Sequence, residues 1–508
     1  MWNVADFTTA AGVTVSELAA YVGESQGGGV PVIRRRPPGE LARELRLAEL
    51  IREGGMTTGT YRDFLRAFLN EGTRLHHPAY LAHQTASPDF PAALADFIHG
   101  ATNNSMAIYE MGAAAATVEF EVVRWMLEKV GFPRGAGVLT HGGSLANLTA
   151  LLAARAHAAP EAWTDGTPGD LVILAPPSAH YSVSRAVSIM GLGQKAIVEL
   201  PTDELGRLDV TKFPDLWGAD STGGPMEGVD GSGGGPVEGA GGSGGGPVEG
   251  AGGSGGGPVE GAGGPTSSRF RGRPIALVAS ACATGTGLHD DLRAVGQWCR
   301  ERGIWFHVDA AHGASALLSP DHRHLLDGVE LADSVVWDAH KMLRTSTLSA
   351  AVLVRREGAL DAAFRQDASY IFYGDQGLDL IGRTVECTKA ELGLKIFLNL
   401  AWRGERGLGD YVAARYATAH RFWELAGRRP GFALPYEPES NIVCFRYGTA
   451  DQAAIRERMM ADGSFYLSST VLNGVRHLRV AVMSPATGDK HLELLLDEIV
   501  RSSPPVPS

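Results

Sequence analysis

Cysteine is scarce in this chain, and long apolar runs are absent. Its 508 residues include four cysteines, no two of which form a C-x-x-C pair, so neither a disulfide framework nor a zinc site is indicated. No apolar run reaches the about 20 residues of a membrane-spanning helix. The N-terminus also lacks the basic and apolar regions of a signal peptide. These absences predict a soluble cytoplasmic protein without a bound metal.

Basic residues are also fewer than acidic ones. The formal net charge is −12, whereas binding to nucleic acid or to an anionic membrane requires basic patches. We therefore expect neither partner. Hydrophobic residues make up 44% of the chain, which is enough for a large core divided among roughly two or three domains.

One segment is rich in glycine and poor in apolar side chains. An 11-residue unit appears four times between Ala219 and Ala262, most clearly as GGSGGGPVEGA at residues 241–251 and 252–262. Such a composition cannot offset the entropy of ordering, so we interpret residues 219–264 as a flexible linker or surface insertion. A partner-binding arm is the alternative, which the lack of apolar anchors disfavours.

Outside this segment, strand-like and helix-like segments alternate. The strand-like runs lie within residues 137–158, 170–193, 194–201, 274–287, 304–313, 334–342 and 349–356. Short apolar strands separated by helices predict an α/β domain with a mostly parallel sheet.

The two ends of the chain have different patterns. Residues before about Leu139 read as helical, without a clear strand. After Arg383, the sequence predicts helices at 386–408 and 410–426, then short strands and a final helix. We therefore expect a helical segment at 1–110, a large domain at 111–385 and a smaller α+β domain at 386–508.

Four predicted strands end in polar residues, in the motifs THGGS, SAHYS, HVDAAHG and DAHK. Taken singly, each has an ordinary interpretation. Ser144 and Asp309 suit helix caps or a structural ion pair. His180 suits a core position, and Lys341 suits a surface lysine whose stem lies on apolar atoms while its ammonium reaches water.

Together, these motifs match what pyridoxal phosphate requires of a protein. A lysine amine holds the aldehyde, and an aspartate pairs with the pyridinium nitrogen. A helix N-terminus binds the phosphate, and a flat side chain stacks on the ring. The joint occurrence of all four in one predicted α/β domain favours a chemical role for Lys341 over the surface interpretation.

The sequence resembles the group II pyridoxal-phosphate-dependent amino-acid decarboxylases, which include glutamate, cysteine sulfinate, 2,4-diaminobutyrate and aromatic amino-acid decarboxylases. The resemblance runs from HHPAYLAHQ to the C-terminal helix, and its most specific motifs are HVDAAHG and the lysine of WDAHK, 32 residues after Asp309. It implies a fold type I enzyme with a large domain like that of aspartate aminotransferase. It also implies a homodimer whose active site lies at the subunit interface.

The resemblance implies catalytic roles for individual residues. Lys341 would bind the cofactor covalently, and Asp309 would pair with the pyridinium nitrogen. His180 would stack on the ring and assist proton transfer. Tyr373 is the candidate for the loop tyrosine that protonates Cα after carbon dioxide leaves. The remaining residues implied to bind the cofactor are Gly143, Ser144, Thr284, Ala311 and His340.

Substrate-binding residues follow from the same resemblance. Arg479 in LRVAVMSP matches the arginine that receives the substrate α-carboxylate in glutamate-type members. His83 falls where such members place a substrate-contacting side chain. Asn103 and Asn104 resemble the glutamate, cysteine sulfinate and diaminobutyrate branch, and we take Asn104 as the substrate contact.

Two motifs depart from the pattern of many members. Cys282 and Ala283 precede Thr284 where a Gly-Thr-Thr run is common, and Asp338 and Ala339 replace Asn-Pro before His-Lys. The predicted reaction is decarboxylation of a polar or charged L-amino acid, of glutamate, aspartate or 2,4-diaminobutyrate type, to the amine. The alternatives are a decarboxylating oxidative deaminase, another fold type I enzyme (an aldolase, desulfurase or lyase), and a cofactor-binding or scaffolding protein without catalysis.

Overall fold

The computed structural model describes residues 3–216, 272–364 and 378–503. The chain forms two compact units, residues 1–210 with 272–508, and residues 211–271. Of the second unit, only residues 211–216 are described, and they belong to the short 3-10 helix Val210–Leu216. Tyr373 and the glycine repeats lie outside the described residues, so the predictions made for them stay predictions.

The first unit contains a seven-stranded sheet in the order β2-β8-β7-β6-β5-β3-β4. Neighbouring strands are parallel from β7 through β6, β5 and β3 to β4. Strand β8 is antiparallel to both β2 and β7, so it runs against the other strands of this sheet. The prediction of an α/β domain with a mostly parallel sheet is confirmed. The strands are β2 (Ala136–Thr140), β3 (Leu171–Ala175), β4 (Ile197–Glu199), β5 (Arg273–Ser280), β6 (Trp305–Asp309), β7 (Ser334–Asp338) and β8 (Ala350–Val354).

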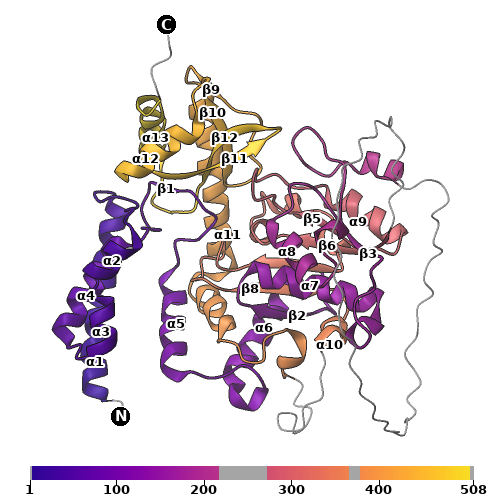
Figure 1. Ribbon diagram of the computed structural model, residues 1–508, viewed down its shortest axis with the longest axis horizontal. Helices are drawn as coiled ribbons and strands as arrows, with labels where there is room; N and C mark the ends of the chain where they lie inside the picture. The colour runs from indigo at the N-terminus through magenta and orange to yellow at the C-terminus, as the bar shows by residue number, and fades with distance from the viewer. Residues whose placement is uncertain (1–2, 217–271, 365–377, 504–508) are drawn as a thin grey trace, which may run out of the picture. The chain divides into compact units, whose positions relative to one another are not determined.

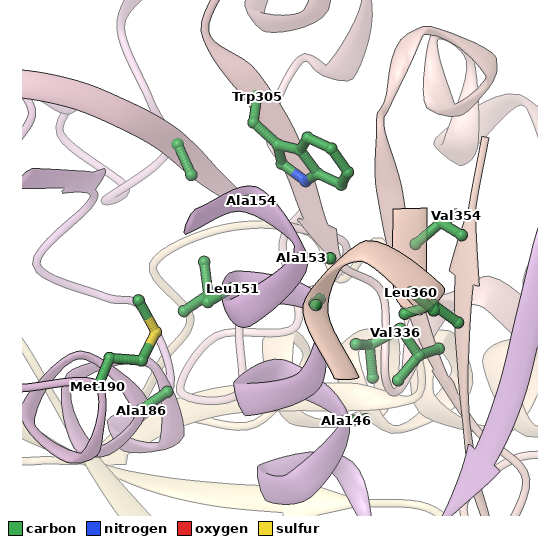
Figure 2. Close-up of a cluster of buried hydrophobic side chains, with 14 of the residues drawn as sticks. Ala146, Leu151, Ala153, Ala154, Ala186, Met190, Trp305, Val336, Val354 and Leu360 are labelled. Carbon is green, nitrogen blue, oxygen red and sulfur yellow. The ribbon is translucent and has the colours of Figure 1, made fainter. Parts of the chain in front are cut away.

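These strands are buried because helices cover the sheet. Every residue of β2, β3, β7 and β8 is buried, as expected for a sheet in an α/β protein. Figure 2 shows α7 beside the sheet, with Ala146, Ala153 and Ala154 near Trp305 and Val336. The short alanine side chains let the helix lie close to the sheet, as a close-packed interior requires. The helices of this region are α6 (Ala113–Lys129), α7 (Gly143–Ala158), α8 (Tyr181–Ile189), α9 (Leu292–Glu301) and α10 (Ala359–Phe364).

A second, five-stranded sheet has the order β1-β11-β12-β10-β9. Its pairs are antiparallel except that of β1 with β11. Strand β1 comes from the part of the chain that we expected to be helical, so that prediction is wrong at this point. A two-residue edge strand exists because a partner strand pairs with it, and it leaves no periodic pattern in the sequence. The strands are β1 (Tyr80–Leu81), β9 (Phe432–Ala433), β10 (Ile442–Tyr447), β11 (Tyr466–Leu472) and β12 (Val475–Ala481).

Helix α11 (Leu392–Gly427) covers the region where we predicted two helices at 386–408 and 410–426, and it consists of two helical halves. Gly404 interrupts it with a φ of 67°, a left-handed conformation that glycine adopts without steric cost. The two predicted helices are therefore present, but the break between them lies at Gly404 rather than at Gly409. Helix α11 contacts α6 as well as β10 and α13, and so links the two sheets. The later helices are α12 (Gln452–Asp462) and α13 (Asp489–Arg501).

The described chain begins with helices that pack on one another. Helix α1 packs against α4, and α5 packs against α11 (Figure 1). Among the described residues, no helix combines the length and the apolar character that crossing a membrane requires. The N-terminal helices are α1 (Val4–Gly27), α2 (Pro38–Glu44), α3 (Leu47–Glu53), α4 (Thr58–Glu71) and α5 (Phe90–Thr102).

Candidate active site

The C-terminal ends of five strands surround one cavity. Strands β2, β3, β5, β6 and β7 run in the same direction, so the residues that follow them meet at one edge of the sheet. The cavity has a volume of about 330 Å³. Every residue that we predicted to bind the cofactor lines it. The lining residues are His141, Gly142, Gly143, Ser144, Asn147, His180, Cys282, Thr284, Asp309, Ala311, His312, Asp338, His340, Lys341 and Leu348.

Lys341 follows β7 and lines the cavity with most of its side chain out of solvent. Its Nζ lies 3.2 Å from Oδ2 of Asp338, and the Lys341 side chain is 19% exposed. Met342 and Leu343, the next residues, are fully buried, which accounts for the apolar run around the lysine. Asp338 supplies the opposite charge that a largely buried ammonium needs. The interpretation of Lys341 as a surface lysine with its ammonium in water is therefore wrong.

Asp309 ends β6 and presents its carboxylate to the cavity. Its Oδ2 accepts a hydrogen bond from Nδ2 of Asn147 at 2.9 Å. Its Oδ1 accepts one from the backbone N–H of Ala311 at 3.3 Å. Two donors from different elements fix the direction of the carboxylate, as pairing with a protonated ring nitrogen requires.

His180 is the N-cap residue of α8. Its Nδ1 lies 2.7 Å from Oγ of Ser182 and accepts the backbone N–H of Ser182 at 3.3 Å. Burial lowers the pKa of His180; the Lys341 charge lowers it further, whereas the Asp309 charge raises it. Since the ordinary value is already below 7, the ring is neutral at neutral pH. A neutral imidazole carries a proton on one ring nitrogen, through which it can donate a hydrogen bond, and its other nitrogen accepts one.

The loop between β2 and α7 is a cradle with little side-chain bulk. Gly142 has a φ of 103°, a conformation that favours glycine. A Cβ at Gly143 would lie 2.7 Å from Oδ2 of Asp338. The N–H groups of Gly143 and Ser144 open α7 and have no acceptor among the described residues. Unpaired N–H groups at the start of a helix bind phosphate.

The loop after β5 forms a further wall. Thr284 and Cys282 line the cavity here, and His312 joins them from the segment after β6. Burial raises the pKa of Cys282 to about 11 and lowers the pKa of His312 to about 3, so both side chains are neutral at pH 7. The charges of Lys341 and Arg479 act on both groups, so the two cations lie near the same wall.

Arg479 lies on β12 and is 5% exposed. Its Nη1 donates to the carbonyl oxygen of Ala82 and to Oγ of Ser468, both at 3.0 Å. Its Nε and Nη2 have no partner within the described residues. These two nitrogens form a fork that fits a carboxylate, and a buried guanidinium without an anion is costly. Arg479 therefore offers a site for a carboxylate.

The other predicted substrate residues lie outside the cavity wall. His83 follows Ala82, and its Nε2 lies 2.8 Å from the hydroxyl oxygen of Tyr466. Burial lowers the pKa of His83, and the nearby charge of Arg479 lowers it further. The structure thus brings His83 beside Arg479. Asn104 is exposed and does not line the cavity, so its role stays a prediction.

Several cavity residues were not predicted as site residues. Asn147 lies one helical turn after Gly143, and it is 2% exposed within the apolar helix α7. A polar residue within the apolar pattern of this predicted helix is the sequence signal that could have indicated it. Asp338 was recognised only as a departure from the decarboxylase pattern, although it lies three residues before Lys341.

The groups in the cavity fit pyridoxal phosphate. Lys341 offers the amine, Asp309 offers a fixed carboxylate for the ring nitrogen, and the start of α7 offers N–H groups for the phosphate. Oδ1 of Asp338, beside the cradle, is buried without a hydrogen-bond partner in the described part of the chain. An unpaired buried polar atom is typical of a site that a ligand completes.

Known proteins are similar to this chain in sequence and in fold. The pyridoxal-dependent decarboxylase conserved domain matches residues 56–215 and 270–448, more than half of the chain. Human acidic amino acid decarboxylase GADL1 is 27% identical over 490 residues, covering 91% of this chain and 84% of the relative. Human cysteine sulfinic acid decarboxylase is 27% identical over 492 residues, covering 92% and 90%. The crystal structure of mouse CSAD has the same fold, with a TM-score of 0.82, 24% identity and 98% of both chains covered. The chain belongs to the pyridoxal-dependent decarboxylase family, and its cofactor is pyridoxal phosphate.

Proposed function

We propose that this protein removes the α-carboxylate of an acidic or other polar amino acid as carbon dioxide and releases the amine. The observation that carries the proposal is the amine of Lys341 and the carboxylate of Asp309 in one cavity, with the unpaired guanidinium of Arg479 near the same wall. The relatives named for acidic amino acids and for cysteine sulfinic acid support a polar substrate.

Each group at the cavity has a part in this reaction. When bound, pyridoxal phosphate supplies an electron-poor ring that accepts the electrons of the bond between Cα and the departing carboxylate. Lys341 would hold the cofactor through Nζ. Asp309 would pair with the ring nitrogen and keep it protonated, which maintains the electron demand of the ring. Asp338, 3.2 Å away, stabilises the ammonium form of Lys341.

The bond between Cα and the carboxylate breaks, and a bond between Cα and a proton replaces it. The proton reaches Cα from an acid at the cavity. His180 acts here in its protonated form, whose acidity burial increases by lowering the pKa, and the ring returns to the neutral state when the proton leaves. We assign it the delivery of this proton, together with Tyr373, which lies outside the described residues. General acids positioned in this way typically contribute about 10²–10⁴-fold to the rate.

Substrate orientation is the proposed role of Arg479. Its free Nε and Nη2 suit the α-carboxylate of the substrate in a two-point contact. His83, beside it, is proposed to contact the substrate as well, and so is Asn104. Fixing the carboxylate relative to the ring selects which bond to Cα breaks, and this geometry separates decarboxylation from transamination or oxidation.

The test is to incubate the purified protein and pyridoxal phosphate with a pool of amino acids and to identify the products by mass spectrometry. The proposal expects an amine lighter than its parent by one carbon dioxide, and none with the Lys341→Ala variant. Aldehydes or keto acids as the sole products would instead support oxidative deamination or another fold type I reaction. A protein that binds the cofactor but converts no amino acid would contradict an enzymatic role.

We further propose that the protein is a homodimer. Large apolar side chains of α5 are exposed, including Leu94 at 42% and Phe97 at 48%, and Trp402 on the adjoining α11 is 56% exposed. Exposed apolar side chains gathered on one surface mark protein contacts. Leu94→Asp should shift the molar mass measured by light scattering from dimer to monomer. Leu494→Asp, at a position on α13 that is also 42% exposed, should leave the dimer intact.

We propose a cytoplasmic location because the cysteines form no disulfides. All four are free thiols, and three of them are buried. Proteins without disulfides are typical of reducing compartments. Fractionation of cells that produce the protein should recover it with soluble cytoplasmic enzymes, and recovery in a secreted fraction would contradict the proposal.

A further inference from the structure

A line of hydrogen bonds runs through the interior behind the cavity. Nε1 of Trp305 donates to Oγ of Ser334 at 2.8 Å. The same Oγ lies 2.8 Å from Nδ1 of His307, and Nε2 of His307 lies 2.9 Å from Oδ1 of Asn147. Each of these four residues is at most 2% exposed. Their bonds are therefore made within the protein interior.

At the cavity this line divides into two branches. Nδ2 of Asn147 donates to Oδ2 of Asp309 at 2.9 Å and to Oγ of Ser182 at 2.8 Å. The second branch continues from Oγ of Ser182 to Nδ1 of His180 at 2.7 Å. One amide nitrogen thus links the carboxylate of Asp309 to the imidazole of His180 through Oγ of Ser182.

The groups at the two ends of this line determine which atom donates and which accepts in each hydrogen bond. A carboxylate only accepts, so the amide nitrogen of Asn147 must face Asp309, and its oxygen must face His307. That oxygen only accepts, so Nε2 of His307 must carry a proton. Burial lowers the pKa of His307 to about 4, so the neutral ring has no second proton, and Nδ1 must accept from Ser334.

The far end of the line agrees with this direction. The indole of Trp305 only donates, and it occupies one lone pair of Ser334 while leaving the hydroxyl proton free for His307. On the other branch, Oγ of Ser182 accepts from Asn147 and gives its own proton to Nδ1 of His180. The single proton of the neutral His180 ring then lies on Nε2, which has no hydrogen bond within the described residues.

We propose that Asn147 is a positioning residue, which orients Asp309 and His180 together and holds the proton of His180 on Nε2. The catalytic consequence rests on the proposed function, because it assumes that Asp309 serves the ring nitrogen and His180 serves Cα. The polarity of the hydrogen bonds does not rest on it. In the loaded enzyme, Asn147→Leu should lower kcat at least tenfold and change KM little, because it removes orientation at the reacting groups while leaving Arg479 intact.

The decisive measurement is the position of the ring proton of His307. In the full-length chain with ¹⁵N-labelled histidine, nuclear magnetic resonance distinguishes a protonated from a bare ring nitrogen, with and without pyridoxal phosphate. We expect the proton on Nε2 in the wild type. In Asn147→Leu, Ser334 is the one acceptor left in this line, so the proton should move to Nδ1.

Asn399→Leu is the matched control. Asn399 is also buried and donates to the carbonyl oxygens of Leu343 and Arg344, at 2.9 and 3.1 Å, without joining this line. Its replacement should leave the proton of His307 on Nε2. A proton on Nδ1 in the wild type overturns the proposal even if the variant does not fold, and so does an unchanged His307 in Asn147→Leu. The position of the His307 proton can be measured in the cofactor-free chain without any turnover. The result of this measurement is therefore independent of the test of the decarboxylase activity.

Discussion

Nζ of Lys341 lies 3.2 Å from Oδ2 of Asp338, and the same carboxylate lies against the backbone of Gly143 at the start of α7. One acidic side chain therefore adjoins both the amine that we propose holds the cofactor and the cradle that we propose binds its phosphate. The carboxylate stabilises the ammonium but opposes a phosphate dianion placed beside it.

Asp338→Asn should tighten the binding of pyridoxal phosphate. Removing one negative charge beside the cradle lowers the repulsion of the phosphate, and with an effective dielectric constant of about 20 the gain amounts to at least about 1 kcal/mol, or several-fold in Kd. Fluorescence titration of the cofactor-free protein measures the change. Pyridoxal, which lacks the phosphate, is the control ligand. An equal gain for both ligands, or a loss for pyridoxal phosphate, would contradict this electrostatic account.

Lys341→Ala should abolish turnover and the visible absorbance band of the lysine-bound cofactor. No other lysine lines the cavity, so within the described residues no second amine is placed to replace it. We expect kcat to fall by at least about 10³-fold, in the range seen when a group that acts covalently is removed. Lys195→Ala, at an exposed position, is the control and should keep both the band and the rate. A Lys341→Ala protein that retained most of its activity would refute the assignment.

Gly143→Ala should weaken the binding of pyridoxal phosphate by at least about tenfold. The new Cβ would lie 2.7 and 2.9 Å from the two carboxylate oxygens of Asp338, so the loop or the aspartate must move. Either shift turns the N–H groups of Gly143 and Ser144 from the phosphate. Gly12→Ala, which adds the same methyl where nothing lies within 4 Å, should leave the Kd unchanged. Equal Kd values for the two variants would show that the cradle tolerates a side chain.

The sequence predicted the fold and the cofactor cavity well, because both depend on local patterns. Each strand of the large sheet is a short apolar run, and the polar residues that follow it are adjacent in sequence. Lys341, Asp309 and His180 could therefore be found without knowing how the strands pair, since parallel strands bring their ends together in any order.

The parts that escaped prediction depend on contacts between distant segments. Strand β1 exists because β11 pairs with it, and the bond of Arg479 to Ala82 spans most of the chain. The place of Asn147 in the site requires that His307 and Asp309 lie on the strand beside it. The periodicity of apolar residues in a sequence does not indicate which distant segments are neighbours, so these contacts become visible only in the folded chain.

Lys389→Met should destabilise the protein strongly. Lys389 and Glu119 form an ion pair in which each side chain is 1% exposed, and both also bond to the backbone of Leu139 in β2. Removing one partner leaves a buried charge alone, which typically costs about 3–5 kcal/mol. Lys129→Met breaks a pair with Glu405 whose side chains are 28% and 50% exposed, and should cost about 1 kcal/mol or less. The midpoints of thermal unfolding compare the two variants. Similar decreases in the midpoint for both variants would contradict this ranking.

Arg479→Met should impair substrate binding while leaving the cofactor in place. The variant removes the free Nε and Nη2 that suit a carboxylate, but Arg479 does not line the cofactor cavity. Losing a two-point contact to a charged group costs roughly 1.5–3 kcal/mol, so kcat/KM should fall by about 10- to 100-fold, mainly through KM. Arg476→Met, on the same strand but exposed, is the matched control and should keep the wild-type kcat/KM. If Arg479→Met instead lost the cofactor and kept its KM, Arg479 would serve the fold of the site, and the carboxylate of the substrate would bind elsewhere.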